Sequence, residues 1–202
     1  MDDVVADLRS FYDQDAHRRA GRELDGPRLV YRERFLGAIG PDACSVLEVG
    51  CGPGKDAQAF VAAGHRYAGL DLSVVHARYT LAVGAPAVHG SLMALPVADD
   101  AVDAAWSMST YMHVPDDDIE AALDELARVV RPGGLIGIGT WGGLGTDVMA
   151  DDAEFDPPRF FALRHHDRMR AHYRRLGRIE HEQTLPPGTD GWEYLFVILR
   201  LG

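Results

Sequence analysis

Three glycines alternate with other residues in the stretch Gly50-Cys51-Gly52-Pro53-Gly54. An apolar run at residues 46–49 precedes them, and a run typical of a helix follows at residues 57–63. Glycine accepts positive φ angles and lets a ligand approach the backbone without meeting a Cβ. The first turn of the next helix also offers unpaired N–H groups. The stretch therefore predicts a strand, a tight turn and a helix start that form a nucleotide-type cofactor loop.

Two carboxylates accompany this loop. Glu48 lies in the strand before the glycines, and Asp71 follows a second apolar run at residues 66–70. A carboxylate about twenty residues beyond a glycine loop, at the end of the second strand, can accept hydrogen bonds from both ribose hydroxyls. The glycine spacing is one residue tighter than the Gly-x-Gly-x-x-Gly of dinucleotide enzymes. Both carboxylates are expected at the carboxyl edge of a parallel sheet, where open α/β folds bind ligands.

The elements that must position these residues alternate along the chain, which predicts an α/β fold with a parallel sheet covered by helices on both faces. Pro27 begins the second helix after the break at residues 25–27. The last strand can pair antiparallel with its neighbour. The predicted strands are residues 46–49, 66–70, 85–89, 101–108, 135–140, 178–184 and 192–199, and the predicted helices are residues 2–20, 27–39, 57–63, 73–83, 116–130 and 165–176.

We expect a single domain over residues 1–202, because 202 residues with 47% hydrophobic side chains suffice for one core. Residues 1–40 form its N-terminal helical part and residues 41–202 its α/β core. Residues 141–158 are glycine-rich and acidic without periodicity, so they are expected to be an irregular loop. Long loops in compact domains tend to be functional.

Charge and cysteine content exclude several partners. Lys and Arg number 20 against 31 Asp and Glu, a net charge of −11 that repels phosphate backbones. The arginines between residues 159 and 178 are interpreted as a solvated face, so nucleic acid is not an expected partner. Cys44 and Cys51 have neither metal-ligand spacing nor the count of a disulfide scaffold, which indicates a reducing, cytoplasmic location.

We predict no membrane partner, because the first residues are acidic and no apolar run approaches the ~20 residues that span a bilayer. No histidine–carboxylate spacing suits chelation, so no metal is predicted. The expected assembly is a monomer or a homodimer.

Several further motifs follow the glycine loop in order. They are Gly69-Leu70-Asp71-Leu72-Ser73, residues 90–96, residues 101–104, Tyr111-Met112-His113-Val114 and residues 122–134. With residues 46–54 they make the chain resemble the class I S-adenosylmethionine-dependent methyltransferases, in the small-molecule group that includes the ubiquinone-biosynthesis type. The resemblance covers about residues 10–200.

This resemblance implies a Rossmann-like fold with a mostly parallel seven-stranded sheet and an antiparallel C-terminal strand. It implies S-adenosylmethionine as cofactor, S-adenosylhomocysteine as product, and methyl transfer to an oxygen or nitrogen of a small molecule.

The resemblance also assigns roles at the cofactor site. The glycine loop would contact the methionyl part, Asp71 the ribose, and Leu72 and His76 the adenine border. Ser107-Met108 would receive the amino group through a backbone carbonyl. The full predicted cofactor set is Tyr12, Arg19, Glu48, Gly50, Cys51, Gly52, Gly54, Asp71, Leu72, His76, Ser91, Leu92, Met93, Ser107 and Met108.

The chain departs from the family at Ser91, where relatives usually carry an aspartate. Serine can still accept a hydrogen bond from the adenine amino group, but without charge assistance the bond is weaker by roughly 1 kcal/mol.

Methyl transfer is an in-line displacement that gains from positioning and from excluding water, so it needs no covalent intermediate. A base is useful only for a hydroxyl or a protonated amine, and histidine suits that role near neutral pH. His113 is the best base candidate by position, with shaping of the pocket as its alternative role. The predicted acceptor pocket, bounded by residues 141–166, contains Tyr111, His113, Trp141, His165 and His166.

Two other functions stay open at this point. A nicotinamide-dependent oxidoreductase would also use a glycine loop, although the tight spacing and the later motifs argue against it. A regulatory protein could retain the fold and bind S-adenosylmethionine or S-adenosylhomocysteine without catalysis. Protein or RNA methylation is less expected, because the chain has no basic extension and has Ser107-Met108-Ser109-Thr110 where an Asn-Pro-Pro-Tyr-type clamp would stand.

Overall fold

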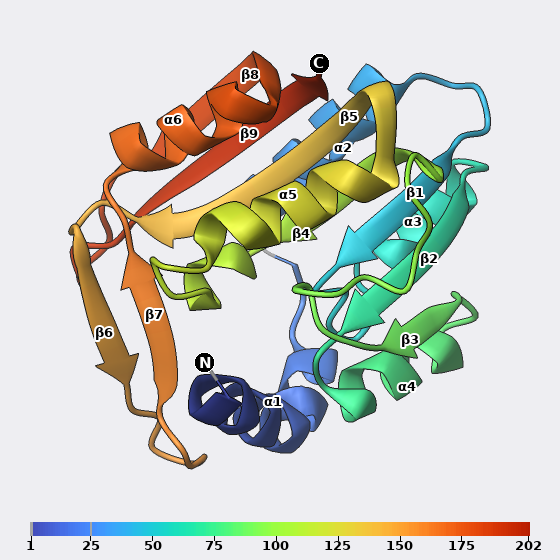
Figure 1. The fold of residues 1–202 in the computed structure, drawn as a ribbon. Helices are drawn as coiled ribbons and strands as arrows, with labels where there is room; N and C mark the ends of the chain where they lie inside the picture. The colour runs from blue at the N-terminus through green and yellow to red at the C-terminus, as the bar shows by residue number, and fades with distance from the viewer. Residues whose placement is uncertain (1, 25) are drawn as a thin grey trace.

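A seven-stranded sheet forms the centre of the computed structural model, which describes residues 2–24 and 26–202 (Figure 1). The strand order is β3-β2-β1-β4-β5-β9-β8. The first five strands in this order run parallel, and β9 runs antiparallel to both β5 and β8. The predicted α/β fold with an antiparallel C-terminal strand is confirmed. The strands are β1 Ser45–Val49, β2 Arg66–Asp71, β3 Ala87–His89, β4 Val102–Met108, β5 Val130–Gly142, β8 Gly177–Leu185 and β9 Glu193–Leu201.

Helices cover both faces of this sheet, as the alternation of elements predicts. Helices α5 and α6 lie on one face, and α2 and α3 lie on the other (Figure 1). The predicted helices appear with bounds shifted by a few residues at most. They are α1 Asp2–Gly21, α2 Gly26–Ile39, α3 Ala57–Ala62, α4 Val74–Ala82, α5 Ile119–Val129 and α6 His166–Leu176, with a short 3₁₀ helix η1 at Tyr111–His113.

Local sequence explains where these elements begin and which faces they bury. The Ser73 hydroxyl caps α4 by accepting the N–H of His76 at 3.0 Å. In α5 the residues at helical spacing, Ile119, Leu123 and Leu126, are all buried against the sheet. The core therefore consists of two layers, one on each face of the strands.

The segment after β5 differs from its prediction. We expected residues 141–158 to be an irregular loop, but β6 Thr146–Ala150 pairs antiparallel with β7 Arg159–Leu163. Phe161 and Leu163 pack with Met112 in a third apolar cluster. Strand β6 offers only two partly buried residues to this cluster, Val148 and Ala150, and glycines and acids surround the strand. Contact with η1 and α1, which no local pattern records, helps hold the hairpin in place.

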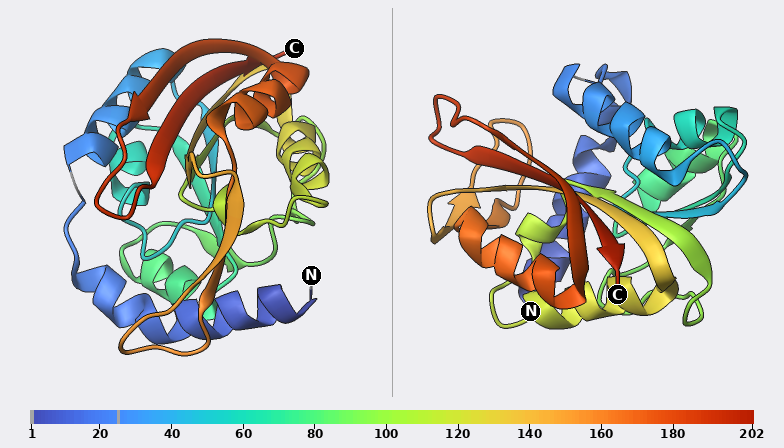
Figure 2. Two further views of the ribbon diagram at one scale, coloured as in Figure 1. Left: turned by 90° about the vertical axis from the view of Figure 1, so that its left-hand side faces the viewer. Right: turned by 90° about the horizontal axis from the view of Figure 1, so that it is seen from above.

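Helix α1 lies across the carboxyl ends of the parallel strands, and the tip of the β6–β7 hairpin reaches it (Figures 1 and 2). The Ser73 hydroxyl donates to Asp13 Oδ1 at 2.6 Å, which joins α1 to the start of α4. Phe11 of α1 meets Phe155 of the hairpin connection edge to face at 5.7 Å. The predicted break at residues 25–27 includes Asp25, which lies outside the described residues. None of the described helices has the length and apolar character needed to span a bilayer.

Candidate active site

Hydrogen bonds from β2 hold the glycine loop after β1. The N–H groups of Gly50 and Cys51 donate to the carbonyl of Leu70 at 2.8 and 3.1 Å. The N–H of Gly52 donates to Asp71 Oδ2 at 2.7 Å. The carboxylate that the sequence singles out is thus bonded directly to the loop, and it fixes the position of the Gly52 backbone.

The three glycines are needed for two different reasons. Their φ angles are +77°, +54° and +79° for Gly50, Gly52 and Gly54, a region that side chains rarely adopt. A Cβ on Gly50 would lie 2.1 Å from Thr110 Oγ1, and one on Gly54 would lie 3.0 Å from Thr80 Cα. A Cβ on Gly52 would meet no described atom within 4 Å. Gly50 and Gly54 therefore permit close packing, whereas the backbone at Gly52 faces open space.

That open space belongs to a cavity of about 430 Å³ at the carboxyl edge of the sheet. The ends of β1, β2, β4 and β5 line it, together with α1, η1 and β7. The structure brings most of the predicted site residues to this cavity. They are Tyr12, Arg19, Gly50, Cys51, Gly52, Asp71, Leu72, His76, Ser91, Leu92, Met93, Met108, His113 and Trp141.

One wall of the cavity combines an engaged carboxylate with a buried nitrogen that has no partner. Asp71 Oδ1 accepts the N–H of Ser73 at 2.9 Å and lies 3.4 Å from His76 Nδ1. The other ring nitrogen of His76, Nε2, is buried without a hydrogen-bond partner among the described residues. Buried polar atoms of this kind normally find a partner. A bound ligand with donors and acceptors beside Asp71 would suit this wall.

Glu48 lies beneath the loop and outside the cavity lining, so the structure gives its prediction as a cofactor contact no support. Its side chain is fully buried, and Oε2 accepts the hydroxyl of Tyr67 at 2.7 Å. Burial, with a smaller effect from the charge of Asp56, raises the pKa of Glu48 well above its usual range. The position of Glu48 in β1 does not by itself show that its side chain is buried in the core and not in the cavity lining.

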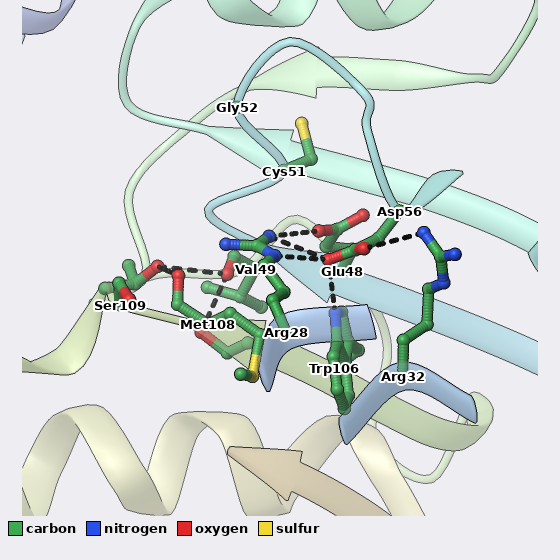
Figure 3. Close-up of polar contacts among 12 residues, drawn as sticks. Arg28, Arg32, Glu48, Val49, Cys51, Gly52, Asp56, Trp106, Met108 and Ser109 are labelled. Carbon is green, nitrogen blue, oxygen red and sulfur yellow. Dashed lines mark hydrogen bonds and ion pairs between the residues drawn. The ribbon is translucent and has the colours of Figure 1, made fainter. Parts of the chain in front are cut away.

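Arg28 of α2 is a cavity residue that the sequence interpretation missed. Figure 3 shows its guanidinium beside two carboxylates, with Nη2 at 2.7 Å from Asp56 Oδ2 and 3.9 Å from Glu48 Oε1. Asp56 also accepts from Arg32 at 3.3 Å and from the indole of Trp106 at 2.9 Å. Burial opposes the charge of Arg28, but Asp56 and Glu48 outweigh it and raise its pKa. No motif marks Arg28, since it lies on an ordinary amphipathic helix.

Two other predicted cofactor residues have side-chain or Cβ-position contacts with the framework, and the backbone-carbonyl role of Ser107 stays a prediction. The Ser107 hydroxyl donates to the carbonyl of Val49 at 2.7 Å and is buried between β1 and β4. Gly54 faces Thr80 of α4, as its close approach requires. Next to Ser107 along the chain, Met108 and Ser109 line the cavity. Side chains alternate along a strand, so one position decides whether a residue faces the core or the site.

Three predicted acceptor residues also lie away from the cavity. Tyr111 is fully buried in the apolar core on the side of α5. His165 is exposed at the start of α6, with Nδ1 at 3.0 Å from the carbonyl of Gly143. His166 is buried with Nδ1 at 3.4 Å from Glu193 Oε2. Adjacent residues of a turn point in different directions, which explains why Met112 and His113 reach the cavity while Tyr111 faces the core.

His113 and Tyr12 are joined at the centre of the cavity wall. His113 Nδ1 lies 2.6 Å from the carbonyl of Phe160, to which it can only donate, and Nε2 lies 2.7 Å from the Tyr12 hydroxyl. Burial lowers the pKa of His113 to about 4. The imidazole is therefore neutral near pH 7, and its Nε2 accepts the hydroxyl hydrogen of Tyr12.

Aromatic rings from separate elements form the far side of the cavity. Phe161 of β7 lies with its ring centroid 4.6 Å from that of His113 and 4.9 Å from that of Trp192. Trp141 at the end of β5 lies 6.5 Å from Trp192. Of these rings, the sequence interpretation assigned only Trp141 and His113 to the pocket.

Comparison with known proteins agrees with this geometry. The pattern of a family described as "Methyltransferase domain" matches residues 47–138. Two curated relatives and one solved structure illustrate the similarity. They are an uncharacterised methyltransferase of Mycobacterium ulcerans (45% identical over 95 residues, covering 45% of this chain and 36% of the relative), the malonyl-[acyl-carrier protein] O-methyltransferase of Pseudescherichia vulneris (39% over 131 residues, 62% and 51%), and the 1,6-didemethyltoxoflavin-N1-methyltransferase of Burkholderia thailandensis with bound 1,6-didemethyltoxoflavin and S-adenosylhomocysteine (TM-score 0.75, 22% identical, 96% and 87%).

The chain matches a methyltransferase domain over residues 47–138. It spans between about a third and a half of the length of the two curated relatives. The solved neighbour, at 22% identity, supports the Rossmann-like fold and no more.

Only part of the cavity lining falls within the residues that match the family. Within residues 47–138 lie the glycine loop, Asp71, Ser91 and His113 of the methyltransferase domain. Outside them lie α1, Arg28, Trp141 and the β6–β7 hairpin. The matched part therefore builds the wall around Asp71, and segments that the family pattern does not describe build the opposite wall.

Proposed function

We propose that this chain binds S-adenosylmethionine in the cavity and transfers its methyl group to an oxygen or nitrogen of a small molecule. One observation carries the proposal: the Gly52 backbone, fixed by Asp71, opens onto a cavity whose wall holds an unpartnered His76 nitrogen. A methyltransferase domain supplies the context.

The residues present fit this cofactor. Asp71 lies where a carboxylate can hold a ribose hydroxyl, because Oδ2 retains a second lone pair beside the one that the Gly52 N–H uses. Ser91, Leu92 and Met93 continue that wall for the adenine. Arg28 offers a cation for the carboxylate of the methionyl part, and it is oriented in advance by Asp56.

When bound, S-adenosylmethionine supplies a methyl group on a positively charged sulfur. The chain's own contribution is positioning and exclusion of water, with α1 and the hairpin covering the edge of the sheet. With a pKa of about 4, His113 is a weak base at neutral pH. The hydrogen bonds favour a role in which Nε2 of His113 holds the Tyr12 hydroxyl toward the cavity.

The class of acceptor atom stays within the proposal. The relative from Pseudescherichia vulneris is named as an O-methyltransferase and the neighbour from Burkholderia thailandensis as an N-methyltransferase. Both are compatible with a cavity of this size. Both cysteines are free thiols, which supports the proposal that the protein works in a reducing compartment such as the cytoplasm.

Calorimetric titration with S-adenosylhomocysteine tests the cofactor. We expect binding by the wild type and at least a tenfold loss in Gly52→Ala, whose Cβ would enter the cavity. Gly64→Ala is the matched control, since Gly64 also has positive φ and no described atom within 4 Å of a Cβ. Equal affinity in wild type and Gly52→Ala, or tighter binding of NADH than of S-adenosylhomocysteine, would refute the proposed site.

Transfer itself is tested with S-adenosylmethionine labelled at the methyl group and a panel of phenols, amines and carboxylates. We expect label in at least one product, with the rate falling in Gly52→Ala. Cofactor binding without transfer to any acceptor would favour the regulatory alternative.

A further inference from the structure

We infer that the acceptor is an anion, a carboxylate on an aromatic or apolar body, and that Arg159 binds its charge. This inference rests on the proposed function, because it concerns the second ligand of the same cavity. It differs from the sequence interpretation, which placed Arg159 on a solvated face.

Arg159 begins β7 and reaches the cavity between two aromatic rings. Its guanidinium carbon lies 4.4 Å from the ring centroid of Phe11 in α1 and 5.2 Å from that of Phe161. Aromatic faces on both sides orient the guanidinium. The guanidinium also interacts with the Tyr12 hydroxyl, where it opposes the rise in the Tyr12 pKa that burial causes. The charge is thus held at the junction of the hairpin, α1 and the cavity.

Arg159 differs from two other cavity arginines, Arg19 and Arg28, in lacking a carboxylate. Arg19 pairs with Asp15 at 2.5 Å, and Arg28 pairs with Asp56 at 2.7 Å. For Arg159, no carboxylate among the described side chains lies within ion-pair distance, and its Nε is buried without a hydrogen-bond partner. A cation in this state favours an anionic ligand.

The nearby carboxylate that could neutralise Arg159 is already engaged. Asp152, in the connection between β6 and β7, accepts two hydrogen bonds from Arg18, at 2.8 and 3.2 Å. This pairing, together with the backbone N–H of Glu154, lowers the pKa of Asp152 to about 2. Arg18 therefore keeps Asp152 outside the cavity and leaves Arg159 for a ligand.

The charge of the cavity lining points the same way. The chain as a whole carries −11, yet the cationic side chains in the lining outnumber the acidic ones. The cationic ones are Arg19, Arg22, Arg28, Lys55 and Arg159, and the acidic ones are Glu23 and Asp71. Asp15 and Asp56 behind the lining neutralise Arg19 and Arg28, so Arg22, Lys55 and Arg159 carry the excess positive charge. A concave site with such an excess concentrates anions. The proposed function assigns Arg28 to the single carboxylate of the cofactor, which leaves Arg159 for the acceptor.

The surroundings of Arg159 define the rest of the acceptor. Phe161, Trp192 and Trp141 offer apolar surface beside it, and Tyr12 offers a hydroxyl. A planar body against these rings would carry its carboxylate to the guanidinium, whose fork matches carboxylate geometry. A carboxylate fits this site better than a neutral amide, whose single carbonyl oxygen can accept a hydrogen bond but leaves the charge of the arginine uncompensated.

The test compares benzoate, cinnamate and 2-naphthoate with their neutral amides, by ligand-detected NMR and calorimetry, with and without saturating S-adenosylhomocysteine. We expect the carboxylates to bind at least tenfold more tightly than the amides. Arg159→Gln should remove that preference while its affinity for S-adenosylhomocysteine changes less than twofold. Arg159→Lys keeps the charge but loses the forked guanidinium. Its preference for carboxylates over amides should lie between those of wild type and Arg159→Gln. Arg178→Gln on the exposed part of β8 is the control and should match wild type.

The outcomes separate this inference from the proposed function. Amides that bind as well as carboxylates, or a carboxylate preference that survives in Arg159→Gln, would overturn the inference while S-adenosylhomocysteine binding stands. Failure of S-adenosylhomocysteine to bind wild type would overturn the proposed function, and the titrations without it would still decide whether Arg159 selects carboxylates. Unchanged S-adenosylhomocysteine affinity and circular dichroism in Arg159→Gln exclude unfolding as the cause of a loss.

Discussion

At the scale of single residues, the cavity depends on side chains held in one protonation state by their neighbours. His113 donates from Nδ1 to Phe160 and accepts from Tyr12 at Nε2, an arrangement open only to the neutral ring. Protonation would bring a second N–H against the tyrosine hydroxyl in a buried place. The position of Tyr12 in the cavity is thus linked to the protonation of His113.

This linkage predicts a pH dependence of stability. Because burial depresses the pKa of His113 from 6.5 to about 4, the unfolded chain binds a proton that the folded chain does not. The neutral His113 contributes at most about 3 kcal/mol to the free energy of unfolding. This contribution is complete above pH 6.5 and is lost as the pH falls toward 4. Urea unfolding gives the free energy of unfolding at pH 7.5 and at pH 5. We expect this free energy to fall less between the two pH values in His113→Asn than in wild type, since asparagine does not titrate. An equal loss in both proteins would contradict the buried, neutral histidine.

Ser91 allows a second prediction at this scale. Its hydroxyl accepts the N–H of Met93 at 3.2 Å and lines the cavity. A carboxylate there can still accept that N–H and adds charge to the adenine contact. Ser91→Asp should therefore bind S-adenosylhomocysteine equally well or up to about 1 kcal/mol more tightly in calorimetry. Ser91→Ala, with no acceptor, should bind more weakly, and a marked loss in Ser91→Asp would mean that Ser91 does not face adenine.

At the scale of elements, α1 is the part of the cavity that the sheet does not fix directly. Its attachment to the core includes the Asp13–Ser73 hydrogen bond and the contact of His17 Nδ1 with the Tyr79 hydroxyl at 3.1 Å. Both join α1 to α4. Since Ser73 also caps α4, a single hydroxyl links the helix above the cavity to the wall that holds Asp71.

Breaking this link should loosen α1. Asp13→Ala removes the acceptor of the buried Ser73 hydroxyl, at a cost of about 1–3 kcal/mol. Amide hydrogen exchange should become faster along α1 and stay unchanged in β4 and β5, and S-adenosylhomocysteine affinity should fall. Asp13→Asn retains an acceptor oxygen and is the matched control. If amide hydrogen exchange along α1 is no faster in Asp13→Ala than in wild type, other contacts hold α1.

At the scale of the whole molecule, the cavity is the place where α1, the sheet and the β6–β7 hairpin meet. A ligand there contacts elements from both ends of the chain. Its binding free energy therefore adds to the stability of the complete fold, because unfolding any one of these elements breaks the site.

Ligand binding should accordingly raise the melting temperature. At one hundred times its Kd a ligand adds about 2.7 kcal/mol, which for a domain of this size corresponds to roughly 5–10 °C. We expect this shift in a thermal melt with S-adenosylhomocysteine. NADH at the same concentration should leave the melting temperature within about 1 °C, as should S-adenosylhomocysteine with Gly52→Ala. An equal shift by NADH would support the oxidoreductase alternative.

Much of this arrangement follows from the sequence alone. The strand and helix alternation is visible because hydrophobic period and turn residues reflect short-range sterics. Gly52 and Asp71 are identifiable because their types and spacing answer a local requirement, positive φ beside a carboxylate. The sequence therefore predicts well the cavity wall around Asp71, which residues 47–138 build. The binding roles of its residues stay predictions.

The tertiary structure alone decided the opposite wall. Arg28 and Arg159 lie on elements with no motif, and their role depends on which carboxylates other segments bring to them. Tyr111 lies one residue from the cavity position Met112 and faces the core, and His166 lies beside Glu193 away from the cavity. The hairpin at residues 146–163 exists through contacts with η1 and α1 that are distant in sequence. Local patterns determine where the chain turns, whereas long-range packing determines which side chains meet and which charge is left for a ligand.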